Sequence, residues 1–299
     1  MTTLQERVDQ HCNDYSSLEP FADARPMSTS IIIPVYNRPD LFDATLATLA
    51  KQDTIRRHSD LFELIIVNDG STQDIDTVMA KYTFSIPVHY LKNQKNQGRS
   101  SARNKGIAKA QGDLLVFFDS DVLIPSGYFS EHWKIHAAGV SAVVIGFVDN
   151  ITTDDERIPA MKNGADLKPD IYHDFRHYTN TLFRTTTAPR EYRLVEETHW
   201  FKHFEKPIDN FTLPDMVVTH NMSVRSDDVH RVGGFDERFC GWGYEDTHFG
   251  AKLIAAGCYL IPVHTGVFRI KHPLREHDES VREEDRQRNK ALYHKMLLE

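Results

Sequence analysis

A short, wholly apolar run that ends on two aspartates is the feature that most constrains the fold of this chain. Residues 114–118 read Leu-Leu-Val-Phe-Phe, and Asp119 and Asp121 follow directly. An uninterrupted apolar run is typical of a central parallel strand with both faces covered. In open α/β sheets, ligands gather just beyond the carboxyl ends of such strands. The two aspartates therefore indicate either a site for a hard divalent cation, Mg²⁺ or Mn²⁺, or an ordinary polar turn.

Earlier strands are expected at residues 30–35 and 62–67, which are largely apolar, and a short strand is expected at 88–91. Between the runs, apolar residues recur at helical spacing, which predicts helices over about 40–52, 74–81 and 99–111. Gly112 stands where the C′ residue that ends the third helix is expected. Strands that alternate with helices predict an α/β fold with a doubly wound, mostly parallel sheet, whose polar turns meet at one edge.

Three side chains in these turns are suited to a nucleoside. Tyr36 offers an aromatic face for a base, Asp69 a carboxylate for a base N–H or a ribose hydroxyl, and Arg103 a guanidinium for carbonyl or phosphate oxygens. The same residues could equally be a packed loop aromatic, a turn residue and a surface helix residue. Neither the G-x-G-x-x-G nor the G-x-x-x-x-G-K-[ST] pattern occurs, which argues against a dinucleotide-binding Rossmann domain.

Composition narrows the class of protein further. The 299 residues are enough for one large α/β domain or two small ones. A formal net charge of −8 argues against a general nucleic-acid binder. The three cysteines show no C-x-x-C spacing, so we expect neither disulfides nor structural zinc, and a reducing cytoplasm fits best. The polar N-terminus and the lack of a long apolar run predict no signal peptide and no transmembrane segment, and peripheral membrane association stays open.

Four segments, in this order, resemble family 2 glycosyltransferases of the GT-A fold: residues 32–38, 67–71, 96–104 and 118–121. The resemblance implies one Rossmann-like α/β domain that binds a nucleotide-diphospho-sugar. It also implies that the D-x-D carboxylates hold a Mn²⁺ or Mg²⁺ ion that bridges the diphosphate of the donor.

The family's roles, carried over residue by residue, give this chain a nucleotide site. Pro34, Tyr36 and Arg38 are expected to border the base. Asp69 is expected to contact the uracil or the ribose, and Arg103 to face the nucleotide. The same resemblance implies that Asp121 is the direct metal ligand. It places Asp119 nearer the ribose or a metal-bound water, so Asp119 is assigned to both the nucleotide site and the metal site.

A second motif, Gly-Trp-Gly-Tyr-Glu-Asp at residues 241–246, carries its own chemistry. Its glycines let the backbone pass close to a ligand, and Trp242 supplies an apolar wall for a sugar face. Glu245 and Asp246 are adjacent carboxylates that could bind hydroxyls and remove a proton. The alternative is an acidic pair at a helix N-terminus, favoured by the helix dipole.

This motif resembles the C-terminal half of β-1,4-galactosyltransferases, chondroitin polymerases and polypeptide N-acetylgalactosaminyltransferases, where it lies beside the donor sugar. The resemblance implies that Asp246 is the catalytic base and that Glu245 orients donor or acceptor. Trp242, Gly243 and Asn221 are assigned to the donor-sugar and acceptor side.

Late histidines are candidates for a third metal ligand. In the resembling families a late histidine after a short strand fills this role, which points to His272 and, as a second candidate, His264. For either residue the alternative is a solvated surface histidine.

The domain organisation expected from these motifs has three parts. Residues 1–27 form an N-terminal extension, 28–275 the GT-A domain, and 276–299 a charged helical tail. Within the domain, 28–125 is the nucleotide-binding half and 126–275 the donor-sugar and acceptor half. Residues 147–214 are unassigned, because their charged and aromatic composition from Asp149 onward is poor for core strands and fits an acceptor face, a lid or a surface insertion.

The tail is expected to be helical and to make apolar contacts through Val281, Ala291, Leu292, Met296 and Leu297, either with its own domain or with a partner.

Taken together, the sequence predicts a metal-dependent hexosyltransferase that moves a sugar from a UDP-sugar to an acceptor hydroxyl with inversion. The acceptor class stays open among carbohydrates, glycoconjugates, peptides and small molecules. A retaining N-acetylgalactosaminyltransferase-like enzyme is the mechanistic alternative. A nucleotidyltransferase and a non-catalytic sugar-nucleotide-binding module are the alternatives of other classes. The sequence does not determine the oligomeric state.

Overall fold

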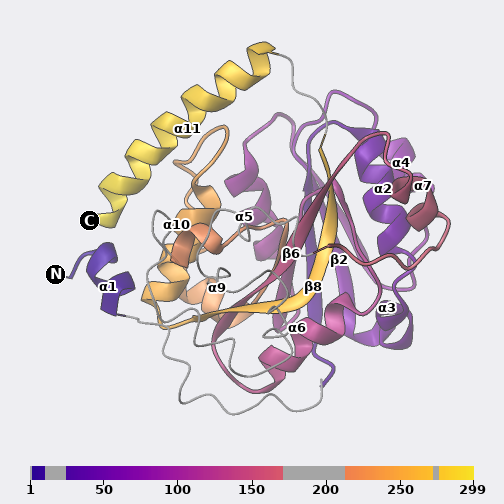
Figure 1. The fold of residues 1–299 in the computed structure, drawn as a ribbon, viewed down its shortest axis with the longest axis horizontal. Helices are drawn as coiled ribbons and strands as arrows, with labels where there is room; N and C mark the ends of the chain where they lie inside the picture. Colours follow the sequence, from indigo (N-terminus) through magenta and orange to yellow (C-terminus); the bar gives the residue numbers. More distant parts are fainter. Residues whose placement is uncertain (1, 11–24, 171–212, 272–275) are drawn as a thin grey trace, which may run out of the picture.

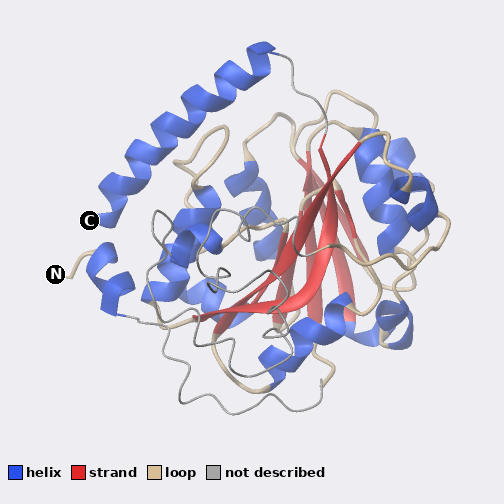
Figure 2. Cartoon of the chain, in the orientation of Figure 1, coloured by secondary structure: helices blue, strands red, loops and turns tan. Residues whose placement is uncertain are grey.

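One eight-stranded mixed sheet runs through the part of the chain that the computed structural model describes, residues 2–10, 25–170, 213–271 and 276–299. Helices cover both faces of this sheet (Figures 1 and 2). The strand order is β3-β2-β1-β4-β7-β6-β8-β5. The strands span Thr29–Val35 (β1), Phe62–Asn68 (β2), Val88–Lys92 (β3), Leu114–Phe118 (β4), Val122–Leu123 (β5), Ala142–Thr152 (β6), Asn221–Arg225 (β7) and Tyr259–Lys271 (β8).

The first half of the sheet has the expected parallel arrangement, in which β1 lies between β2 and β4 and β3 pairs with β2. The second half is mixed. β7 runs antiparallel to both β4 and β6, whereas β6 and β8 are parallel. Short β5 pairs antiparallel with β8, and this pairing brings β8 beside the end of β4.

Helices on one side of the sheet are α5 (Arg99–Lys109), α9 (Ser226–Val232) and α10 (Glu245–Ala255). The other side carries α2 (Pro39–Leu49), α3 (Asp53–Arg57), α4 (Asp76–Ala80) and α7 (Arg157–Lys162) (Figure 1). Helix α6 (Tyr128–Ala137) also contributes Tyr128, Phe129 and Trp133 to the apolar cluster on the α2 side. Pro39 begins α2, a first-turn position where a missing N–H costs nothing.

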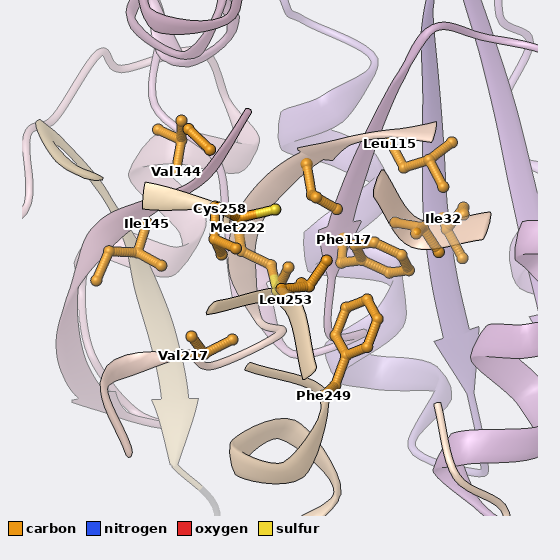
Figure 3. Packing of buried hydrophobic residues seen from close by; sticks show 14 of the residues in the cluster. Ile32, Leu115, Phe117, Val144, Ile145, Val217, Met222, Phe249, Leu253 and Cys258 are labelled. Carbon is orange, nitrogen blue, oxygen red and sulfur yellow. The ribbon is translucent and has the colours of Figure 1, made fainter. Parts of the chain in front are cut away.

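Alternating side chains of the central strands fill two separate cores. Ile32, Leu115 and Phe117 face the helices α5 and α10, and Figure 3 shows them packed with Met222, Phe249 and Leu253. Their sequence neighbours on β1 and β4 face the α2 side instead. Both faces of these strands are therefore apolar and covered, which explains the uninterrupted hydrophobic runs.

The predicted elements of the first half agree with the structure to within a few residues, with one change of role. Helix α5 ends at Lys109 with Ala110 as its C-cap, so Gly112 is not the C′ residue. It is also absent from the glycines with positive φ. A Cβ at Gly112 would lie 2.7 Å from the backbone N of Ser30, so glycine is needed there for a close approach to β1.

The expectation that the chain from Asp149 onward is poor for a core strand is wrong at its start. Strand β6 continues through Asp149 to Thr152 along β8. Asp149 is fully buried, and its charge is compensated by Arg157, whose Nη1 lies 3.0 Å from Oδ2. A paired carboxylate can occupy a buried strand position. Residues 171–212 lie outside the described residues.

The two ends of the chain pack together against α10. Helix α1 (Leu4–Gln10) lies next to the C-terminal end of helix α11 (Glu276–Leu297) at one edge of the molecule (Figure 1). Leu292, Met296 and Leu297 join this apolar cluster, as expected, whereas Val281 and Ala291 are exposed and the contacts expected of them are wrong. The tail therefore packs on its own domain. Across the described segments, no helix combines the length and apolar character needed to cross a bilayer.

Candidate functional site

The two aspartates after β4 lie at the junction of the two halves of the sheet. Val122 pairs with Arg269 in the β5–β8 ladder, and the backbone N–H of Ile270 donates to the carbonyl of Asp121 at 2.8 Å. This register fixes the Asp119–Asp121 turn against β8. Side chains from β4, α5, α10 and β8 converge here.

Arg103 of α5 connects three carboxylates at this junction. Its guanidinium donates to Asp119 Oδ1 at 3.1 Å, to Glu245 Oε1 at 3.4 Å and to Asp246 Oδ1 at 3.3 Å. Its side chain is only 2% exposed. The guanidinium also stacks over the ring of Phe235, 5.4 Å from its centroid. Arg103 is thus an internal link between the two motifs and presents little surface to a nucleotide.

Asp246 is held in one orientation at the start of α10. Thr219 donates its backbone N–H to Asp246 Oδ2 at 3.1 Å, and its hydroxyl lies 3.0 Å from both carboxylate oxygens. Tyr244, the residue before the acidic pair, has a left-handed φ of 67°. Such a conformation is costly for a residue with a side chain and is often found at functional sites. Glu245 is buried, and Arg99 lies 3.6 Å from it.

The carboxylates of the site differ in their proton affinity. Burial raises the pKa of Asp246 to about 6; attraction to Arg103 opposes the shift, and repulsion from Glu245 adds to it. Burial also raises the pKa of Asp121, against the effect of Arg269. For Asp119, burial acts in the same direction, but Arg103 and Arg269 outweigh it and hold the pKa well below its usual range. Asp246 is therefore a carboxylate that can take up a proton near neutral pH.

Asp69 holds the loop that leads into α5. Its carboxylate accepts hydrogen bonds from Asn93 Nδ2 at 2.7 Å and from the backbone N–H groups of Gln97 and Gly98, both at 2.9 Å. The side chain is 3% exposed. Asp69 thus fixes the segment from which Arg99 and Arg103 project.

The residues expected at the base form an exposed turn after β1. Tyr36 is 48% exposed, and Pro34 is half-buried in β1. Asn37 and Arg38 both have left-handed φ angles, 59° and 56°. The turn is tied to the loop after β2, because Asn37 N–H donates to Ser71 Oγ at 2.8 Å. Tyr36 is therefore accessible to a ligand at this edge of the sheet.

Asn221 is placed differently from the sugar-facing role expected of it. The residue is fully buried at the start of β7. Its Oδ1 accepts from the Tyr128 hydroxyl at 2.7 Å, and its Nδ2 donates to the carbonyl of Phe147 at 2.7 Å. Both polar groups are therefore used to join β7 to α6 and β6.

The loop that carries Trp242 is held by α11. Asn289 Nδ2 lies within hydrogen-bond distance of three backbone carbonyls, those of Cys240, Trp242 and Gly243, at 3.0, 3.2 and 3.0 Å. Asp285 accepts from the backbone N–H of Trp242 at 3.2 Å. Trp242 and Gly243 are partly exposed at this loop. The C-terminal helix is thus a structural part of the site.

The donor set at Asp119 and Asp121 fits a hard divalent cation. Asp121 Oδ1 is buried and accepts no hydrogen bond from the described residues. A buried carboxylate oxygen without a donor is suited to a cation. No cluster of three or more metal-binding side chains occurs among the described residues. His272 and the side chain of His264, the candidates for a third ligand, lie outside them.

Several residues of the site were not expected from the sequence. Arg269 of β8 contacts both Asp119 and Asp121, and Thr219 orients Asp246. From α11, Arg282 is close enough to Arg99 and Arg269 that burial and repulsion from their charges lower its pKa. For Arg269 and Arg282, the sequence shows only a basic residue in a strand or a helix that follows residues 241–246.

A mostly parallel sheet with acidic side chains beyond β4 and at the start of α10 defines the class of protein. The same fold occurs in a mannosyltransferase from Pyrobaculum calidifontis solved with GDP-Man and Mn²⁺, at 16% identity and a TM-score of 0.57, covering 93% of this chain and 66% of that one. It also occurs in GalNAc-T7 solved with UDP, GalNAc and Mn²⁺, at 16% identity and a TM-score of 0.60, covering 83% of this chain and 45% of that one. The fold is that of a GT-A glycosyltransferase.

The family follows from the sequence comparison. The model of glycosyl transferase family 2 matches residues 30–220, which is more than half of the chain, and the model described as the N-terminal domain of galactosyltransferase matches residues 208–277. The chain belongs to glycosyl transferase family 2. Both resemblances noted in the sequence are thereby confirmed.

Named relatives share the domain within longer proteins. Validoxylamine A glucosyltransferase of Streptomyces hygroscopicus subsp. jinggangensis is 32% identical over 80% of this chain and 54% of its own length. Chondroitin synthase of Pasteurella multocida is 26% identical over 98% of this chain and 30% of its own length. The chain thus spans about half or less of these relatives.

Proposed function

We propose that this protein transfers a hexosyl group from a nucleotide-diphospho-sugar, with UDP-sugar as the expected donor, to an acceptor hydroxyl with inversion at the anomeric carbon. One observation carries the proposal. Arg103 joins Asp119, a member of the D-x-D pair, to Asp246, a carboxylate whose pKa is raised to about 6. In this proposal, the acid that serves the nucleotide and the proton acceptor share one guanidinium as their partner.

Each residue of the site has a chemical role in this proposal. Tyr36, with Pro34 and Arg38, borders the base, and Asp69 supports the loop that completes this end of the site. Asp121 and Asp119 would hold a Mn²⁺ or Mg²⁺ ion, which when bound neutralises the charge that develops on the departing diphosphate. Asp246 accepts the proton of the acceptor hydroxyl.

Trp242 and Glu245 define the sugar end of the site. The partly exposed indole of Trp242 offers an apolar face to a sugar ring, and Gly243, with φ 96°, keeps the loop in a conformation that other residues rarely adopt. Glu245 lies beside Asp246 and is neutralised by Arg103 and Arg99. Its proposed role is to orient a hydroxyl of donor or acceptor while Asp246 takes the proton.

The metal and donor parts of the proposal are tested by calorimetry with UDP in the presence and absence of Mn²⁺. We expect Asp121→Ala to remove the Mn²⁺-dependent part of the UDP affinity, a loss of at least about tenfold, since a metal ligand is removed. Unchanged Mn²⁺-dependent affinity in this variant would overturn the metal assignment. Asp43→Ala serves as the matched control, because it removes an acid of α2 that pairs with Lys81 and Lys162 and with no residue of the site.

Transfer itself is tested with a panel of UDP-sugars and Mn²⁺. Donors that bind the native state raise its melting temperature, and those are then supplied with candidate acceptors. Anomeric NMR of the product distinguishes inversion from retention. Release of pyrophosphate in place of UDP would instead identify a nucleotidyltransferase.

A further inference from the structure

Arg269 of β8 lies against both carboxylates of the Asp119–Asp121 pair. Its Nη2 is 3.3 Å from Asp119 Oδ2, and its Nε is 3.4 Å from Asp121 Oδ2. The two oxygens that Arg269 contacts therefore belong to the two acids proposed for the metal. The side chain is 30% exposed, so one part of it faces open space.

The backbone leaves Arg269 little choice of position. The β5–β8 ladder sets Arg269 opposite Val122, one residue after Asp121. The hydrogen bond from Ile270 N–H to the Asp121 carbonyl, 2.8 Å long, locks the same register. The guanidinium can move on its flexible methylene chain, but the Cα of Arg269 stays beside the two aspartates.

Charges of both signs meet at the site. Its four carboxylates, Asp119, Asp121, Glu245 and Asp246, make ion pairs with three guanidinium groups, those of Arg99, Arg103 and Arg269. A divalent cation added alone would therefore enter a neighbourhood already rich in positive charge. A diphosphate added alone would face four carboxylates. When cation and diphosphate bind together, their opposite charges offset one another.

We propose that Arg269 is the resident counter-ion of the two metal-binding carboxylates, and that its guanidinium transfers to the donor diphosphate when a divalent cation takes its place. This inference rests on the proposed function, because it assumes a metal at Asp121 and a diphosphate donor. Arginine suits both partners, since its planar fork binds carboxylate and phosphate oxygens alike. Metal and nucleotide then bind as a coupled pair, each raising the affinity for the other by the same factor.

The test measures Mn²⁺ binding by the electron paramagnetic resonance of free Mn²⁺, and UDP binding by calorimetry, in the wild type and in Arg269→Gln. Without nucleotide, Mn²⁺ should bind the variant about tenfold more tightly, because a competing positive charge is gone. With saturating Mn²⁺, UDP should bind about tenfold more weakly, because a charge-assisted contact is lost. These opposite signs are specific, since general damage to the site would weaken both ligands.

Two further variants separate charge from packing. Arg269→Lys keeps the positive charge, so its Mn²⁺ affinity without nucleotide should stay near that of the wild type. Arg56→Gln is the control, because Arg56 lies in α3, is 59% exposed and pairs with the exposed Asp53, which does not belong to the site. It should leave both affinities unchanged.

The outcomes assign failure to the correct step. Suppose that Asp121→Ala abolishes Mn²⁺ binding. If Arg269→Gln then leaves the Mn²⁺ affinity unchanged, or lowers it together with the UDP affinity, the proposed role of Arg269 is wrong but the metal site is supported. If the wild type binds no Mn²⁺ with or without UDP, the metal part of the proposed function fails as well. Melting curves in chelator confirm that each variant is folded.

Discussion

Arg103 Nη1 lies 3.3 Å from Asp246 Oδ1, while Nη2 of the same guanidinium lies 3.1 Å from Asp119 Oδ1. The contact joins α5 to the start of α10 across a separation of 143 residues in the chain. Because the side chain is 2% exposed, this link is shielded from solvent and screened little by salt. The proposed base therefore has a fixed position relative to the strand end that carries the D-x-D pair.

The first prediction concerns the pH dependence of transfer. Burial raises the pKa of Asp246 to about 6, so its carboxylate is ionised above that pH and protonated below it. A general base must be ionised, so kcat should rise with pH through about 6 and fall about tenfold per unit below it. The measurement is a pH–rate profile at saturating donor and acceptor.

Asp246→Asn should abolish the fall of kcat at acidic pH, the acid limb of the pH–rate profile. It should also lower kcat by about 100-fold or more, because the amide cannot accept the proton. UDP affinity should stay near that of the wild type, since the proposed nucleotide contacts are untouched. A variant that keeps both its turnover and its acid limb would exclude Asp246 as the base.

The second prediction concerns the stability that depends on Arg103. Arg103→Met leaves Asp119, Glu245 and Asp246 without their shared cation, and removing one partner of a buried ion pair costs about 3–5 kcal/mol. Urea denaturation should detect this loss. The deficit should shrink as the pH is lowered, because protonation removes the repulsion among the carboxylates. A deficit independent of pH would point to lost packing on Phe235 instead.

The parallel half of the sheet could be predicted from the sequence because each buried strand is marked by a short run of neighbouring apolar residues. The run at residues 114–118 is apolar on both faces, since β4 is covered on both sides, and it stops where the acids begin. The same rule gave β1 and β2 to within a residue, whereas β3 is a half-exposed edge strand whose position followed from its place in the alternation of strands and helices. The rule failed at β6, where the charged residue Asp149 suggested a loop but lies buried in the β6–β8 ladder with Arg157 as its ion-pair partner.

The arrangement of the site was less accessible, because it depends on partners distant in sequence. Arg103 was expected to face the nucleotide, yet it is buried against acids that lie 16, 142 and 143 residues away. Arg269 acquires its place only from the β5–β8 register. Residue types at a motif indicate which chemistry is available; which side chains neutralise one another is decided by the packing of whole elements.

The third prediction concerns the link between α11 and the Trp242 loop. Asn289 is 1% exposed and faces three loop carbonyls, so Asn289→Ala should destabilise the protein by about 1–3 kcal/mol and loosen the loop. If the loop positions Trp242 less well against the donor sugar, kcat for transfer should fall, while the affinity for UDP changes less than about twofold. The adjacent, exposed Lys290→Ala is the control and should behave as the wild type. Equal losses in kcat and UDP affinity would show that the effect is not confined to the loop.

The last prediction concerns the group that orients the proposed base. The hydroxyl of Thr219 lies 3.0 Å from both oxygens of Asp246, and its donated hydrogen bond favours the ionised carboxylate. Thr219→Val keeps the shape and the backbone N–H donor but removes the hydroxyl, so the pKa of Asp246 should rise and the acid limb of the pH–rate profile should move to higher pH. Thr219→Ser retains the hydroxyl and should restore the wild-type limb. An unshifted profile in the valine variant would mean that the limb reports another group, and Asp246 would lose its support as the base.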